Sequence, residues 1–150
     1  MQRREFIKTT CLSCANLAII GTVSSLILQS CNTVKYVTVL PKDNKLAIKK
    51  ADFMVLKNEK TSYREWVLVK TEKAPFPIGV FRFDDNNYSA LYLECTHQGC
   101  EVQPQGDHLQ CPCHGAEFSN IGKVVQAPAE KDLKKFQVET DKENIYILLK

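Results

Sequence analysis

Short apolar runs separated by polar turn clusters make up the chain after residue 34. The runs are rich in β-branched and aromatic residues and are bounded by turn-forming residues, which is the pattern of short β-strands. They lie at residues 34–40, 46–56, 63–70 and 78–83. No long stretch in this part repeats its apolar residues with a helical period. The pattern therefore predicts an all-β fold.

Two of the polar clusters predict β-hairpins. A cluster of Asp and Asn at residues 84–87 separates the run 78–83 from another apolar run at 88–93, and such residues favour tight turns. Near the C-terminus, a charged turn separates the runs 135–139 and 145–149. We expect each pair of runs to form neighbouring antiparallel strands.

The first 34 residues follow a different pattern. Arg3 and Arg4 begin a short basic head, and no charged residue occurs between Lys8 and Lys35. This is the layout of an export signal, and its apolar residues are diluted by Ser, Thr and Asn, which suits export better than firm anchoring. The string Arg-Arg-x-Phe-Ile-Lys resembles a twin-arginine signal, which implies export of a protein already folded around its cofactor. The alternative is the basic flank of an ordinary membrane segment.

Cys31 follows the string Leu-Gln-Ser, which resembles a bacterial lipoprotein cleavage box. This resemblance implies that Cys31 is lipidated and becomes the N-terminus, anchored by several acyl chains. The alternative is an uncleaved membrane helix from about residue 9 to residue 30, because about 20 residues span a bilayer. Both place the folded part on the periplasmic or extracytoplasmic side of a bacterial membrane. We therefore predict a signal or anchor at residues 1–30 and a folded domain at residues 31–150.

Composition and charge limit the function. The chain has 150 residues, 44% of them hydrophobic and 25% charged, which fits one globular domain and not a multidomain enzyme. The formal net charge is +3, and it falls to about +1 once residues 1–30 are removed. A partner nucleic acid is excluded because its binding needs a strongly basic face.

Candidate metal ligands gather in two motifs, which read Cys-Thr-His-Gln-Gly-Cys at residues 95–100 and Cys-Pro-Cys-His-Gly at residues 111–115. Each motif offers thiolates and an imidazole, so the two loops can share one metal site if they face each other. A structural zinc site remains an alternative for this donor set, although zinc sites usually pair two cysteines on one loop with two histidines on another. His108, Cys11 and Cys14 lie outside the motifs, and we assign them no role.

These two motifs resemble those of the Rieske [2Fe-2S] proteins, Cys-x-His-x-Gly-Cys and Cys-x-Cys-His-Gly. The resemblance implies a Rieske-like antiparallel β-sandwich whose cluster-binding part covers about residues 90–130. It implies that one [2Fe-2S] cluster per chain is held through its inner iron by two cysteines and through its outer iron by two histidines, and that a disulfide joins the loops. The implied ligands are Cys95, Cys111, His97 and His114, and the implied disulfide is Cys100–Cys113. A disulfide agrees with an oxidising compartment.

Three departures from the family pattern bear on the reduction potential and the partner. Quinol-oxidising relatives carry Ser and Tyr where this chain has Ala116 and Phe118, and loss of these hydroxyl donors predicts a middle or low Rieske potential. Gln98 stands where those relatives have Leu, which weakens the quinol interpretation. Residues 127–129 resemble the family's proline loop, which covers the cluster from a third side.

The resemblance implies one-electron transfer in the cell envelope, with a cytochrome, an oxidoreductase subunit or a quinol as partner. We find no separate nucleophile, general base or nucleotide loop, so no catalytic residue is predicted. The alternatives are an iron–sulphur subunit of a quinol–cytochrome oxidoreductase or of an arsenite-oxidase-like complex, and a structural zinc-binding module. A ring-hydroxylating oxygenase is disfavoured because the chain has no room for a second, mononuclear-iron domain.

Overall fold

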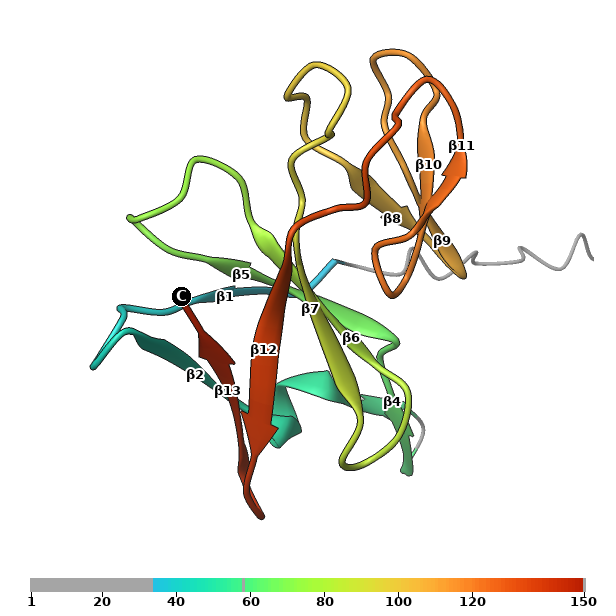
Figure 1. Ribbon diagram of the computed structural model, residues 1–150. Helices are drawn as coiled ribbons and strands as arrows, with labels where there is room; N and C mark the ends of the chain where they lie inside the picture. Colours follow the sequence, from blue (N-terminus) through green and yellow to red (C-terminus); the bar gives the residue numbers. More distant parts are fainter. Residues whose placement is uncertain (1–33, 58, 150) are drawn as a thin grey trace, which may run out of the picture. The chain divides into compact units, whose positions relative to one another are not determined.

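The computed structural model describes residues 34–57 and 59–149 (Figure 1). These residues form thirteen strands and one short 3₁₀ helix, η1 (Lys50–Phe53), so the predicted all-β fold is confirmed. No helix in the described part is long and apolar enough to cross a membrane. The predicted signal at 1–30 and the lipidation site Cys31 lie outside the described residues.

A seven-stranded sheet forms the larger part of the domain. Its strand order is β1-β5-β6-β7-β12-β13-β2, with β1 parallel to β5 and all other neighbours antiparallel. The strands are β1 (Tyr36–Thr38), β2 (Lys45–Lys49), β5 (Trp66–Lys70), β6 (Ile78–Arg82), β7 (Tyr88–Tyr92), β12 (Lys135–Thr140) and β13 (Asn144–Leu148). Both predicted hairpins are present, as β6–β7 and β12–β13.

The apolar core of this sheet joins strands from its two sides. Leu46 and Ile48 of β2 belong to the same buried cluster as Val67 and Val69 of β5, although four strands separate β2 from β5 in the sheet order. The sheet is therefore curled, so that one face encloses the cluster. Alternation of buried and exposed residues along β2 is what such a one-sided core requires.

A four-stranded sheet lies between β7 and β12 in the sequence and stands beyond one end of the larger sheet (Figure 1). Its order is β11-β10-β9-β8, and the strands are β8 (Gln103–Gln105), β9 (His108–Gln110), β10 (Glu117–Ser119) and β11 (Val124–Gln126). A second buried cluster connects the sheets, because Phe81 and Leu91 of the larger sheet pack with Leu109 and Phe118 of the smaller one. The two cysteine motifs are attached to this connecting core.

The structure differs from the sequence prediction at three places, one of which is the run 63–70, because Tyr63 ends one strand and β5 begins only at Trp66. The run 46–56 is interrupted by η1, where Asp52 accepts a hydrogen bond from the backbone N–H of Lys49. A separate hairpin follows, formed by β3 (Met54–Lys57) and β4 (Lys60–Tyr63). The three-residue strands of the smaller sheet were also not predicted, because they are too short to show an alternating pattern.

Candidate metal centre

The two cysteine motifs fold into loops with the same backbone hydrogen bonds. In the first loop, the N–H of Cys95 donates to the carbonyl of Cys100 (2.8 Å) and the N–H of Gly99 donates to the carbonyl of Cys95 (2.8 Å). In the second, the N–H of Cys111 donates to the carbonyl of Ala116 (2.8 Å), and that of Gly115 donates to the carbonyl of Cys111 (3.0 Å). Each motif is thus a tight loop that begins at a cysteine.

Strand pairing closes both loops at their base. The second loop is the tip of the β9–β10 hairpin, and the first is closed by an isolated bridge between Glu94 and Glu101. The glycine at the fifth position of each loop has a positive φ, 72° at Gly99 and 75° at Gly115. Only glycine adopts this backbone conformation at little cost, which explains its place in both motifs.

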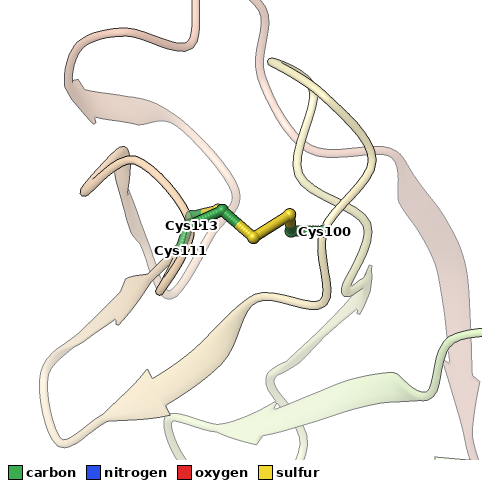
Figure 2. A group of neighbouring side chains, drawn as sticks. All are labelled: Cys100, Cys111 and Cys113. Atoms are coloured by element: carbon green, nitrogen blue, oxygen red, sulfur yellow. A yellow bond between two sulfur atoms is a disulfide. The ribbon is translucent and has the colours of Figure 1, made fainter.

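A disulfide between Cys100 and Cys113 joins the two loops (Figure 2). The sulphur atoms of Cys100, Cys111 and Cys113 lie within 4.8 Å of one another. Because two of these sulphurs are bonded to each other, Cys111 is the member of this group with a thiol available to a metal. Among the described residues, the cysteines outside the disulfide are Cys95 and Cys111.

The two available thiols are buried and adjacent. Cys95 is 3% exposed and Cys111 is 1% exposed. Burial raises the pKa of the Cys95 thiol, the backbone N–H of His97 opposes this effect, and the neighbouring thiol of Cys111 adds to it. Two thiolates packed together in an apolar environment need a positive partner, and a metal supplies it.

The two motif histidines lie on the outside of the same site. His97 and His114 are both exposed, and their rings meet edge to face with centroids 5.1 Å apart. The structure therefore brings together two buried thiols and two exposed imidazoles, one of each from either loop. This donor set fits a [2Fe-2S] cluster with mixed ligands, in which sulphur binds one iron and nitrogen the other.

The end of β11 and the segment after it are hydrogen-bonded to both loops. The side-chain amide of Gln126 donates to the carbonyl of Gly115 (3.0 Å), and the hydroxyl of Thr96 donates to the carbonyl of Lys131 (2.6 Å). Residues 127–129 lie between these two attachment points, where the proline loop was expected. Nothing in the sequence indicated the contact of Gln126, because its partner is a backbone atom of another loop.

Three other residues were singled out in the sequence, and two of them lie beside the buried cysteines. Ala116 and Phe118 are completely buried in the same apolar cluster as Cys95 and Cys111. His108 lies on β9 outside both loops, where its Nδ1 is 3.0 Å from a carboxylate oxygen of Asp107.

Comparison with known proteins agrees with the site. The Rieske [2Fe-2S] domain family matches the chain over residues 46–137. The protein YhfW of Bacillus subtilis (strain 168), whose name places it with the Rieske 2Fe-2S iron–sulphur proteins, is 40% identical over 63 residues, which are 41% of this chain and 12% of that protein. The cytochrome b6-f complex iron–sulphur subunit of Synechococcus sp. (strain CC9605) is 36% identical over 55 residues, 35% of this chain and 31% of that subunit. The chain thus spans under a third of the length of either relative.

A solved structure shares the fold. The quaternary ammonium Rieske monooxygenase CntA matches with a TM-score of 0.54 and 17% identity, over 71% of this chain and 32% of that one. At this identity the similarity concerns the fold alone. The family match covers more than half of the chain and includes both cysteine loops, so the chain belongs to the Rieske [2Fe-2S] domain family, and its cofactor is a [2Fe-2S] cluster rather than structural zinc.

Proposed function

We propose that this protein transfers single electrons through a [2Fe-2S] cluster held by four residues of the two loops. The proposed ligands are Cys95 and Cys111 for the inner iron and His97 and His114 for the outer iron. The observation that supports this assignment is the pairing of two buried thiols with two exposed, adjacent imidazoles. The cluster supplies a one-electron redox couple when it is bound.

The cysteine side of the proposed site is buried and its histidine side is exposed. Burial of Cys95 and Cys111 keeps water from the sulphur side. Exposure of His97 and His114 lets a partner approach the imidazole side.

The partner is proposed to be a redox protein, either a cytochrome or a subunit of an oxidoreductase, with a quinol as the alternative. The similarity to an iron–sulphur subunit of a cytochrome b6-f complex supports a role within such a complex. Co-purification of the tagged chain with a cytochrome b would favour that role, and co-purification with a molybdopterin subunit would favour an arsenite-oxidase-like complex. Isolation of the chain alone would favour a free carrier.

We also propose a membrane-attached location on the outer side of the cytoplasmic membrane. The support is the charge-free segment behind Arg3 and Arg4 and the cleavage-box resemblance at Cys31. Replacement of both arginines by lysine is expected to keep the chain in the cytoplasm. Replacement of Cys31 by serine is expected to abolish lipid labelling, and persistent membrane attachment of that variant would favour the uncleaved helix.

Spectroscopy of the purified full chain tests the electron-transfer proposal. We expect two irons and two acid-labile sulphides per chain, visible absorption when oxidised, and an EPR signal after reduction by dithionite. His97→Ala and His114→Ala are expected to lose the signal, while the control His108→Ala keeps it. Retention of an unchanged cluster in both ligand variants would refute the ligand assignment.

A further inference from the structure

A cavity of about 310 Å³ opens at one end of the seven-stranded sheet. Its wall comes from the segment after β5, the start of β6, the end of β7, the start of β12 and the residue after β13. These strands are antiparallel neighbours, so the strand ends that line the cavity all lie at the same end of the sheet. The cavity is therefore the open mouth of the curled sheet, a place where small-molecule sites often occur.

The inner wall of this cavity is apolar. Ile78 is completely buried and Phe136 is 8% exposed, while Leu149 and the ring of Tyr92 are half-buried. Tyr92 packs against Phe76 with ring centroids 6.1 Å apart, which fixes the position of its ring. Such a wall can hold an aromatic or aliphatic body but offers little to a fully hydrated ion.

Two lysines belong to the cavity lining. Lys73 and Lys134 both line it, and none of its lining residues in the described part of the chain is an Asp or a Glu. Within the described part of the chain, neither lysine forms an ion pair. The Nζ atom of Lys134 lies 5.1 Å from the centroid of the Phe136 ring, so one cation stands directly over an apolar wall residue. A bound anion would therefore meet positive charge beside an apolar surface.

From this combination we propose that the cavity binds a small organic carboxylate with an aromatic or aliphatic body. The body packs on Tyr92, Phe136 and Leu149, and the carboxylate accepts hydrogen bonds from the ammonium groups of Lys73 and Lys134. A ligand without the carboxylate would lose the pairing with the lysines, and a ligand without the apolar body would lose the contact with the cavity wall, so each should bind more weakly. This site is separate from the cysteine loops and goes beyond electron transfer.

Fluorine NMR titration of the full, cluster-loaded chain with 6-fluoro-2-naphthoate tests the proposal. Saturable binding of one naphthoate per chain is expected. Lys73→Gln and Lys134→Gln should each weaken binding about tenfold, the effect of one lost charge-assisted hydrogen bond. The matched control Lys135→Gln changes the next residue, which does not line the cavity, and should leave the affinity within about twofold.

Two further measurements make the result decisive. The uncharged analogue with a hydroxymethyl group in place of the carboxylate should bind at least about tenfold more weakly. Ala74→Phe, which fills the cavity, should abolish binding while the visible spectrum of the cluster stays unchanged. Equal binding of the analogue, an equal loss in Lys135→Gln, full binding by Ala74→Phe, or no saturable binding of naphthoate would each overturn the proposal.

Discussion

Ala116 and Phe118 occupy the two positions at which a single added oxygen atom is expected to raise the reduction potential. Both side chains are 0% exposed and share an apolar cluster with Cys95 and Cys111. Ala116→Ser and Phe118→Tyr each add a hydroxyl to this buried, apolar environment. A hydroxyl that donates to the sulphur side of the site stabilises the reduced form more, because that form carries the extra negative charge.

The size of the shift follows from the strength of hydrogen bonds. A neutral hydrogen bond contributes about 1 kcal/mol, and one to a charged acceptor about 1.5–3 kcal/mol. A difference of about 1–1.5 kcal/mol between the two redox states corresponds to about 45–65 mV, since about 59 mV for one electron is a tenfold change in the equilibrium constant. The double variant is expected to shift by up to about 130 mV if the two effects add.

Protein-film voltammetry of the variants at fixed pH measures these shifts. The matched control is Ala90→Ser, because Ala90 is equally buried but belongs to the other apolar cluster, in the larger sheet. We expect the control to keep the original potential. A shift below about 10 mV in Ala116→Ser, a shift to lower potential, or an equal shift in the control would refute the reasoning. A high potential for the unmodified chain would refute the prediction made from these two positions.

Further predictions concern stability. Replacing Cys100 and Cys113 by alanine opens a loop with a sequence separation of 13, which should cost about 3 kcal/mol by chain entropy and lower the urea midpoint followed by the fluorescence of the single tryptophan. Gly115→Ala should destabilise the protein by about 1–2 kcal/mol and speed loss of visible absorption, whereas Gly106→Ala, also at positive φ, should cost the same stability without speeding that loss. A tyrosine hydroxyl and two backbone N–H groups hold the pKa of Asp141 well below its usual value. The ionised carboxylate therefore adds to the free energy of unfolding in full above the unfolded pKa of about 3.9, and this contribution is lost as pH falls through the folded pKa. Asp141→Asn should therefore be less stable at pH 7 in thermal melts, and the gap should close only below about pH 4.

Two hairpins of the larger sheet could be predicted from the sequence because each is local. The turn at residues 84–87 and the alternating run of β12 carry their own signals. The order of strands was not predictable, since β12 pairs with β7 across the whole inserted sheet. The helix η1 interrupts the run 46–56, and it is stabilised by a side-chain contact of Asp52. The pattern of apolar and polar residues does not indicate such a contact.

The loops of the site were predictable to the extent that their chemistry is local. Gly99 and Gly115 mark tight turns in the sequence, and the cysteine and histidine spacing marks the metal chemistry. The contact that Gln126 makes with the second loop was not predictable, because any donor of suitable length could reach a backbone carbonyl. The resemblance implied that His97 and His114 bind the outer iron, and both side chains are exposed.

Contacts within each loop determine its shape, and contacts between segments determine where the loops lie relative to each other. Backbone hydrogen bonds that begin at Cys95 and Cys111 set the shape of each loop without reference to the other. The disulfide and the side chain of Gln126 set how the second loop stands relative to its neighbours. These contacts involve no metal, so they can hold the thiols close together before iron arrives. Because burial raises the pKa of the Cys95 thiol, cluster binding must displace a firmly held proton there, and cluster loss is expected to accelerate as pH falls.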